Sequence, residues 1–248
     1  MAATVIIPAR YASTRFPAKI IASATGRPLV QHVVDQVRQC TRVREIIVAA
    51  DDQRIAKALE PFETKVVMTS PAHQSGTDRM AEVAEKLEDD IVVNVQGDEP
   101  EIEPAIIDGL IQRLEERDDD MATAATPFPP GADVANPNLV KVVMGHNGNA
   151  LYFSRSAIPF WRDQETAKES EGPPPYYLHL GIYAYQRRFL LDFASWKPSP
   201  YERAEKLEQL RALERGRSIF VLKVERASHG IDTAEQYQAF VKRWKAKT

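Results

Sequence analysis

The strongest constraint on the fold of this chain is the alternation, through its first half, of short apolar runs with segments of helical periodicity. The apolar runs lie at 4–7 (TVII), 45–50 (EIIVAA), 65–70 (KVVMTS) and 90–96 (DIVVNVQ). The segments of helical spacing lie at 27–40, 51–60, 75–88 and 103–117. Continuous apolar runs are typical of parallel strands buried on both faces, and repeated β-α-β units place helices over both faces of the sheet. The pattern predicts an α/β fold with a mostly parallel central sheet.

The second half of the chain has a different pattern. Strand-like stretches occur at 120–127, at 178–185, and at 140–155, where an Asn147-Gly148 pair predicts a hairpin turn. A strong helix is predicted at 199–216, because Ser199 and Glu202 have capping-box spacing and Gly216 follows the last turn. A strand at 219–225 and a helix at 233–247 complete the chain. We expect a single domain, 1–248, with a smaller mixed β/loop insertion at about 127–195.

Composition excludes several classes of protein. A net charge of −3 over 248 residues lacks the basic excess of nucleic-acid-binding proteins. A single cysteine excludes an internal disulfide and a multi-cysteine zinc site. The apolar runs are shorter than the roughly 18–20 residues that span a bilayer, and the N-terminus lacks the basic region of a secretory signal. We expect a soluble cytoplasmic protein with neither a nucleic-acid nor a membrane partner.

A stiff basic loop, PARYASTRFPAK, follows the first predicted strand. It carries Arg10, Arg15 and Lys19 and contains no glycine. In open parallel sheets ligands bind beyond the carboxyl ends of the strands, which is where this loop lies. The glycine-rich phosphate loops GxxxxGK[ST] and GxGxxG are absent, so cationic side chains would have to supply the charge that binds a polyphosphate. A solvated basic surface loop is the alternative from this segment alone.

An acidic loop, QGDEP (96–100), follows the fourth predicted strand and therefore lies at the same edge of the sheet. Asp98 at the end of a buried strand favours a divalent cation, since magnesium binds one or two carboxylates together with phosphate oxygens and water. Glu101 and Glu103 are better explained as acids at the start of a helix. Acidic and basic loops at one sheet edge are typical of a site for a metal–nucleotide complex.

The residues alone do not decide the role of three further segments. HQSGTDR (73–79) suits contact with a base or ribose, or a plain capping box formed by Ser75 and Asp78. His179 lies among alternating apolar residues, as a core histidine would. Asp232 has the position of a residue that starts the last helix.

Seven sequence blocks, taken in order, resemble the CMP-Kdo synthetases (3-deoxy-manno-octulosonate cytidylyltransferases). The blocks are PARYASTRFPAK, HQSGTDR, VNVQGDEP, KVV…ALYFSR, HLGIYAY, PSPYERAEKLEQLR and GIDT, over residues 4–240. The resemblance implies a Rossmann-like three-layer nucleotidyltransferase fold and a homodimer formed through the insertion. It also implies Mg²⁺ as cofactor and the reaction of CTP with Kdo to give CMP-Kdo and pyrophosphate. That reaction activates the sugar for lipopolysaccharide biosynthesis.

The same resemblance implies roles for individual residues. Those implied to bind the nucleotide are Ala9, Arg10, Ser13, Arg15, Lys19, Ser75, Gly76, Thr77, Arg79 and Gln96. Those implied to bind the sugar are Gln96, His179, Tyr183, Glu208 and Gln209. Asp98 and Asp232 would hold the metal, and Arg10, Lys19 and Asp98 would be catalytic.

Several positions depart from the usual motifs of the family. Ala18 replaces a glycine in the first loop, Leu178 replaces a basic residue before His179, and GIDTAEQY replaces a more common V-D-T-P-E-D-L. A cytidylyltransferase for a modified Kdo or another sugar acid, or a metal-dependent glycosyltransferase, is the alternative. A nucleotide-binding protein without catalytic activity is a further one.

Overall fold

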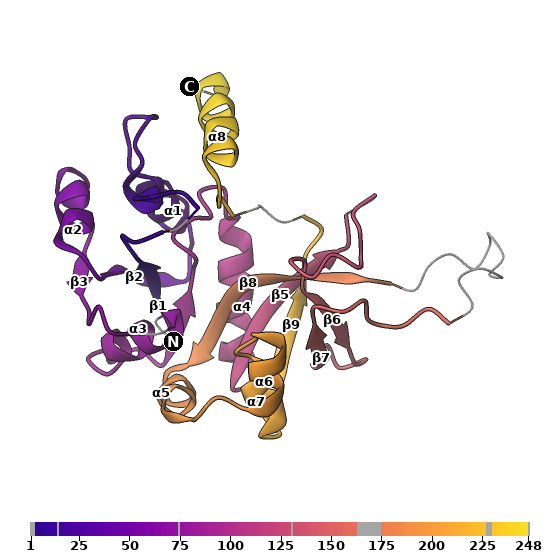
Figure 1. Ribbon diagram of the computed structural model, residues 1–248. Coiled ribbons are helices and arrows are strands. Elements are labelled where there is room, and N and C mark those ends of the chain that lie inside the picture. Colours follow the sequence, from indigo (N-terminus) through magenta and orange to yellow (C-terminus); the bar gives the residue numbers. More distant parts are fainter. Residues whose placement is uncertain are drawn as a thin grey trace.

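A mixed β-sheet runs through the centre of the computed structural model, which describes residues 3–13, 15–73, 75–129, 131–162, 175–226 and 230–247 (Figure 1). The strands along its main path are β1 (Ala3–Ala9), β2 (Val43–Ala50), β3 (Val66–Met68), β4 (Ile91–Asn94), β5 (Met121–Pro127), β8 (Tyr177–Gln186) and β9 (Ile219–Lys223). Their spatial order is β3-β2-β1-β4-β8-β5-β9. Pairing is parallel from β3 to β4 and again between β5 and β9, and only β8 runs antiparallel to its neighbours on this path. The predicted α/β fold with a mostly parallel sheet is confirmed.

Helices cover both faces of this sheet and make a three-layer arrangement. One hydrophobic cluster joins the sheet to α1 (Leu29–Val37), α2 (Gln53–Leu59) and α4 (Pro104–Glu116). A second cluster joins the other face to α3 (Gly76–Ala84), α5 (Arg187–Ser195) and α7 (Leu210–Glu214). Each strand therefore needs apolar side chains on both faces, which is why β1 reads as an unbroken apolar run. No helix among the described residues is long and apolar enough to cross a membrane.

The last helix, α8 (Ala234–Lys247), packs across the start of α1. Its Tyr237 and Phe240 form a small cluster with Leu29, and Phe16 of the first loop packs against them. The Tyr237 hydroxyl also accepts a hydrogen bond from the Ala24 backbone N at 2.7 Å. The C-terminus of the chain therefore supports the loop that follows β1.

The second half contains the predicted hairpin, formed by β6 (Lys141–Met144) and β7 (Ala150–Ser154). Gly148 has φ 82° and its N donates to the Gly145 carbonyl at 3.0 Å, so the turn lies where Asn147-Gly148 predicted it. The hairpin joins the main sheet where Lys141 pairs with Leu178. The division into one domain with an insertion at 127–195 stays a prediction, and residues 130 and 163–174 of that stretch lie outside the described part.

The prediction of one continuous helix at 199–216 is wrong. The structure has two short helices, α6 (Pro200–Glu205) and α7, separated at Lys206, whose φ of 54° is left-handed. The predicted ends are confirmed, since Ser199 and Glu202 form a capping box and Gly216 has φ 71°. Helix α5 was not predicted at all, because it lies in the stretch assigned to strands and loops.

Candidate active site

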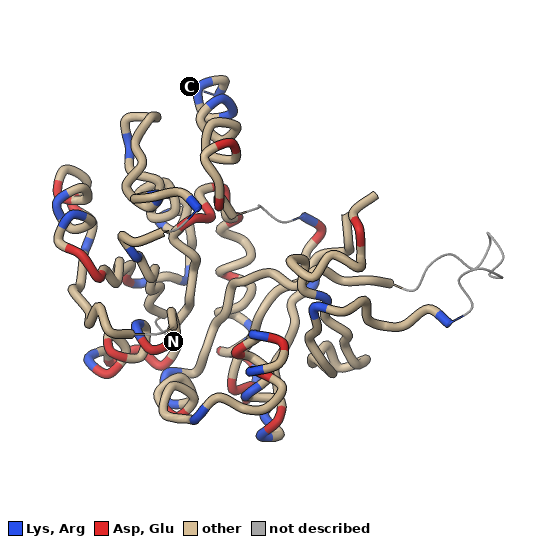
Figure 2. Tube along the Cα trace, viewed as in Figure 1, with Lys and Arg blue, Asp and Glu red and all other residues tan. Residues whose placement is uncertain are grey.

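The basic first loop and the acidic loop after β4 meet at the carboxyl edge of the parallel strands. Lys19 begins the 3₁₀ helix η1 (Lys19–Ile21), and its Nζ lies 2.6 Å from Asp98 Oδ2 and 3.2 Å from Asp232 Oδ1. Arg15 Nη2 lies 2.9 Å from the same Asp232 oxygen. Figure 2 shows these acidic and basic segments together below α8. Two carboxylates from distant parts of the chain thus share one ammonium group.

Local backbone features bring these segments together. Gly97 allows the close approach, since a Cβ there would lie 2.9 Å from the Ile20 side chain and 3.1 Å from the Pro8 carbonyl oxygen. The segment that carries Asp232 is fixed by the Ile231 N, which donates to the Asp98 carbonyl at 2.9 Å. Ala18 has φ 56°, so the turn before Lys19 keeps the left-handed conformation that a glycine adopts more readily.

The remaining residues of the first loop leave cationic groups available to a ligand. Arg10 is exposed, donates to the His73 carbonyl at 3.4 Å, and has no ion pair with any residue that the structure describes. The Arg15 side chain is 67% exposed. Ala9 ends β1 and Ser13 is half-buried on the same loop. Anions approaching this edge would meet Arg10 and Arg15 first.

Residues Gly76–Arg79 of the segment HQSGTDR form the first turn of α3, and Ser75 is its N-cap. Ser75 and Asp78 form the capping box that the sequence offered as one interpretation. Arg79, by contrast, is only 1% exposed: it donates to Thr69 Oγ1 at 2.5 Å and lies 3.6 Å from Asp51 Oδ2. Asp51 in turn accepts from the Tyr11 N at 2.9 Å. Arg79 therefore lies beneath the first loop and acts on its shape through Asp51.

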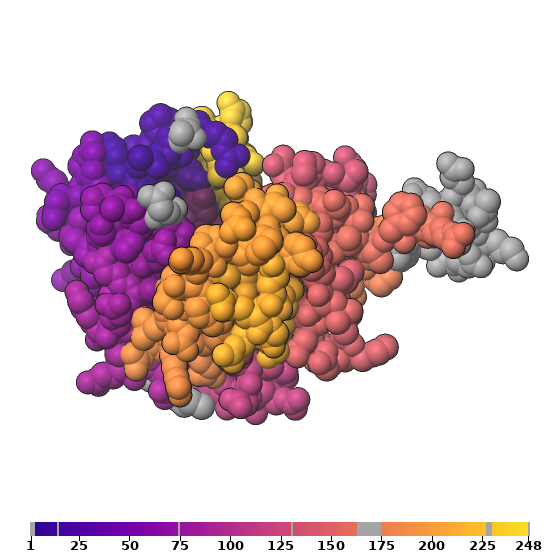
Figure 3. Space-filling model, turned by 60° about the horizontal axis from the view of Figure 1, so that its bottom comes forward, coloured from indigo at the N-terminus to yellow at the C-terminus, as the bar shows by residue number. Residues whose placement is uncertain are grey.

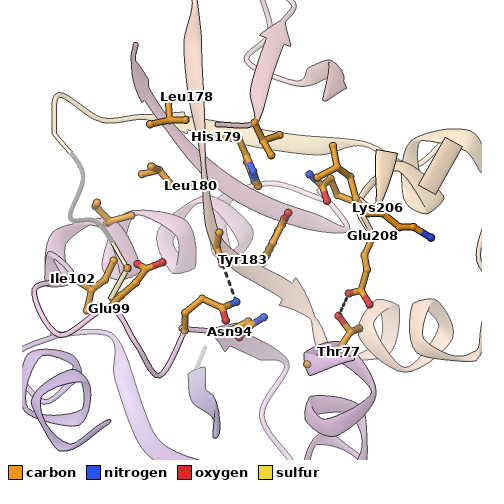
Figure 4. Close-up of a pocket in the computed structure, with 18 of the residues that line it drawn as sticks. Thr77, Asn94, Glu99, Ile102, Leu178, His179, Leu180, Tyr183, Lys206 and Glu208 are labelled. Atoms are coloured by element: carbon orange, nitrogen blue, oxygen red, sulfur yellow. Dashed lines mark hydrogen bonds between the residues drawn. The ribbon is translucent and has the colours of Figure 1, made fainter. Parts of the chain in front are cut away.

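A cavity of about 460 Å³ adjoins the Lys19 cluster. Gln96 and Glu99, on either side of Gly97 and Asp98, line it, so the cavity and the carboxylates share one loop. Every residue that the resemblance assigned to sugar binding lines it, together with Gly76 and Thr77: Gln96, His179, Tyr183, Glu208 and Gln209 (Figure 4). Figure 3 shows the residues of α6 and α7, in orange, meeting the indigo and purple N-terminal half across a recess.

We call the residues assigned to sugar binding, together with Thr77, the cavity wall. An irregularity in β8 positions its first part, His179 and Tyr183. The β5·β8 register passes from Thr123↔Tyr183 to Ala124↔Leu180, which leaves Gly181 and Ile182 without partners in β5. Thr123 Oγ1 holds the irregularity, since it donates to the Ile182 carbonyl at 2.7 Å and lies 3.0 Å from His179 Nε2. A bulge of this kind turns side chains toward a site beside the sheet.

Burial sets the charge of these side chains. Burial lowers the pKa of His179 to about 3, so its imidazole is neutral at physiological pH. Burial, and then the neighbouring Tyr185 and Glu208, raise the pKa of Tyr183 well above its ordinary value, so its phenol stays protonated. His179 and Tyr183 therefore offer neutral hydrogen-bonding groups, unlike the charged loop beside them.

The break between α6 and α7 positions the second part of the wall. Glu208 follows the left-handed Lys206, and its Oε2 accepts from Thr77 Oγ1 at 2.5 Å. Arg155 holds the break in place: its Nε donates to the Glu205 carbonyl at 2.6 Å and its N to Glu205 Oε2 at 2.9 Å. Nothing local in the sequence signals this break, since neither glycine nor proline lies at 203–209.

Asn94 and Glu99 are polar residues of the cavity that were not predicted to bind a ligand. Asn94 ends β4 and lines the cavity floor, and Glu99 lies beside it in Figure 4. Burial, and then the charge of Asp98, raise the pKa of Glu99 to about 8. The only signal in the sequence was that both residues belong to the block VNVQGDEP.

The family comparison agrees with this geometry. A sequence model described as "Cytidylyltransferase" matches residues 4–219. The 3-deoxy-manno-octulosonate cytidylyltransferase of Geobacter metallireducens is 48% identical over 248 residues, 98% of each chain. The enzyme of the same name from Idiomarina loihiensis is 46% identical over 245 residues, 96% of each chain.

Solved structures give the same result. A structure described as CMP:2-keto-3-deoxy-manno-octonic acid synthetase complexed with CTP matches with a TM-score of 0.92 and 38% identity, covering 100% of both chains. The 4-diphosphocytidyl-2C-methyl-D-erythritol synthase of Anaerococcus prevotii matches with a TM-score of 0.62 over 99% of this chain and 96% of its own. At 13% identity this second match shows a shared fold alone.

Proposed function

Because this chain belongs to the cytidylyltransferase family, we propose that it transfers CMP from CTP to 3-deoxy-D-manno-octulosonate (Kdo). The products are CMP-Kdo and pyrophosphate, and the reaction activates the sugar for lipopolysaccharide biosynthesis. The observation that carries the proposal is the Lys19–Asp98–Asp232 cluster beside a cavity lined by the neutral hydrogen-bonding groups of His179 and Tyr183. Such a site can hold a triphosphate and a sugar acid side by side, as group transfer between them requires.

The first loop binds the triphosphate in this proposal. Arg10, Arg15 and Lys19 pair with the phosphates and stabilise the charge that builds up on the departing pyrophosphate. The capped start of α3, with Ser75, Gly76 and Thr77, contributes backbone N–H groups and a hydroxyl to the nucleotide. Arg79 supports the loop from beneath instead of contacting the nucleotide.

Asp98 and Asp232 fit a magnesium site. Oxygens of both carboxylates already converge on one cation, the Lys19 ammonium, and two carboxylates plus phosphate oxygens are a suitable ligand set for Mg²⁺. When bound there, Mg²⁺ would neutralise phosphate charge and lower the pKa of the attacking hydroxyl. The two aspartates hold Lys19 and bring the QGDEP loop and the segment before α8 to one point.

The cavity wall orients the sugar. Neutral His179 and protonated Tyr183 offer hydrogen bonds to hydroxyls, and Gln96 and Gln209 extend this surface. Their role is to present the anomeric hydroxyl to the α-phosphorus of CTP in line with the leaving pyrophosphate. A homodimer and a cytoplasmic location stay predictions.

A substrate matrix tests the proposal. The purified protein, with MgCl₂, is assayed for pyrophosphate release with each of CTP, UTP, ATP and GTP against Kdo, 8-amino-Kdo and sialic acid. We expect turnover with CTP and Kdo to exceed every other combination. A maximum at another sugar acid would reassign the substrate, and absence of pyrophosphate in every combination would contradict nucleotidyl transfer.

A further inference from the structure

The floor of the cavity contains a buried amide oxygen with no hydrogen-bond partner among the described residues. Asn94 is 5% exposed, and within the described part of the chain its Oδ1 has none. An unpaired buried amide destabilises a fold, so such groups are rare and each calls for an explanation. One common explanation is that a ligand supplies the missing partner.

Two neighbouring polar side chains of the cavity, by contrast, have partners within it. Thr77 donates to Glu208 at 2.5 Å, and Gln96 Nε2 donates to the Gly181 carbonyl at 3.2 Å. Gln209 resembles Asn94, because its Nε2 is also buried and unpaired among the described residues. Asn94 and Gln209 thus leave an amide oxygen and an amide nitrogen unused in the same cavity.

The strand register places Asn94 on the sugar side of the cavity. Asn94 and Tyr183 are directly opposite in the antiparallel β4·β8 pair, so their side chains lie on the same face. Figure 4 shows Tyr183 above Asn94, with Thr77 and Glu208 to one side and Glu99 to the other.

We propose that Asn94 is a specificity-determining residue that hydrogen-bonds a hydroxyl of the sugar acid. This inference rests on the proposed function. A hydroxyl both donates and accepts, so it complements either end of the amide. A carboxylate or phosphate only accepts and would be repelled by the amide oxygen. The Asn94 contact therefore distinguishes sugar acids by a hydroxyl, whereas the first loop distinguishes ligands by negative charge.

The test compares two substitutions that remove the same kind of group. Asn94→Leu preserves the approximate shape but removes the amide, and Asn94→Ala serves as a second variant if the leucine does not fit. The matched control is Asn149→Leu, because Asn149 Oδ1 is also buried and has no partner in the described part of the chain, but it lies at the β6–β7 hairpin, outside the cavity. Steady-state kinetics with CTP and Kdo and the Tm of the ligand-free protein are measured for all three variants.

We expect Asn94→Leu to raise the KM for Kdo about tenfold, the effect of one lost hydrogen bond, with the KM for CTP unchanged. Its ligand-free Tm should be equal to or above that of the wild type, because a buried unpaired group is gone. Asn149→Leu should change neither KM. An equal rise in both KM values, or an unchanged KM for Kdo, would overturn the proposal.

Monodeoxy Kdo analogues identify the contact directly. The wild type should lose about tenfold in kcat/KM with the analogue that lacks the contacted hydroxyl, and Asn94→Ala should lose nothing further with that analogue. Equal losses in the wild type and the variant for every analogue would contradict a hydroxyl contact. Failure of the wild type to turn over Kdo at all would instead contradict the proposed function, so the two failures are distinguishable.

Discussion

The first loop and the cavity wall, two neighbouring halves of one site, are built in opposite ways. The first loop takes its cations from one stretch of twelve residues, 8–19, and leaves Arg15 largely exposed. The cavity wall takes its groups from β4, α3, β8 and the α6–α7 break, and burial keeps His179 and Tyr183 uncharged. The charged half can bind phosphate without close shape complementarity, because Coulomb attraction acts over several ångströms. The neutral half depends on hydrogen-bond geometry and therefore on exact packing.

The largest effect is expected where the two halves meet, at Asp98. Asp98→Asn removes a negative charge from both the Lys19 pair and the proposed magnesium site, so kcat should fall at least about a hundredfold. Pyrophosphate release at saturating MgCl₂ measures the loss. The control is Glu101→Gln, three residues along the same loop, whose carboxylate pairs with Arg243 and should leave kcat unchanged. Near-normal turnover by Asp98→Asn would remove this residue from the catalytic centre.

A smaller and more selective effect is expected from Arg155, which does not line the cavity itself but contacts the backbone of the wall at Lys206. Its guanidinium donates to the Pro137 carbonyl at 2.8 Å and to the Glu205 carbonyl at 2.6 Å, just before the wall segments 138–140 and 206–209. Arg155→Ala should therefore raise the KM for Kdo about tenfold and leave the KM for CTP within twofold.

Two further variants check this positioning role. Arg155→Lys keeps the charge but loses the fork that binds several carbonyls, so it should resemble the alanine variant. Arg113→Ala, which breaks a comparable partly buried pair with Asp119, should change neither KM. Equal changes in both KM values after Arg155→Ala would indicate general loosening of the fold.

The smallest effect is expected on the pH dependence of stability, through the neutral imidazole of His179 in the cavity wall. Burial in the folded state lowers the pKa of His179 from 6.5 to about 3. Between these two pH values the unfolded chain binds a proton at this residue and the folded chain does not. The free energy of unfolding should therefore decrease as pH falls from about 6.5 toward 3, by at most about 1.4 kcal/mol per pH unit from this residue. Urea denaturation at pH 7.5, 6 and 5 measures the slope. His179→Gln should flatten it, and the exposed His146→Gln should not. An unchanged slope in the His179 variant would mean that other groups carry the acid sensitivity.

The charged half of the site was largely predictable from the sequence. The parallel β-α-β order placed the first loop and QGDEP at one edge, and Lys19 and Asp98 do meet there at 2.6 Å. The burial of Arg79 was not predictable in this way. The motif indicated a nucleotide contact, and it does not show that the side chain is buried beneath the loop it supports. The roles of these residues stay proposals, although their positions agree with them.

The neutral half was predictable only through family resemblance. Periodicity at 199–216 indicated one helix, yet the wall depends on its interruption at Lys206, which Arg155 stabilises from 51 positions away in the sequence. Asn94 looked like the end of a buried strand. Its amide oxygen, unpaired among the residues that the structure describes, became visible only once β4 was set against β8.

By itself, the sequence determined the layered α/β fold, the shared edge of its loops and the cations and carboxylates that gather there. The apolar runs of strands, the periodicity of helices, their caps and the local charge all depend on residues close together in the sequence. They can therefore be recognised without the structure. The tertiary structure alone decided which polar groups are buried, which helix breaks, and which amides stay unpaired. Those outcomes depend on the competition between distant contacts, local conformational preference and the exclusion of water, which no short stretch of sequence contains.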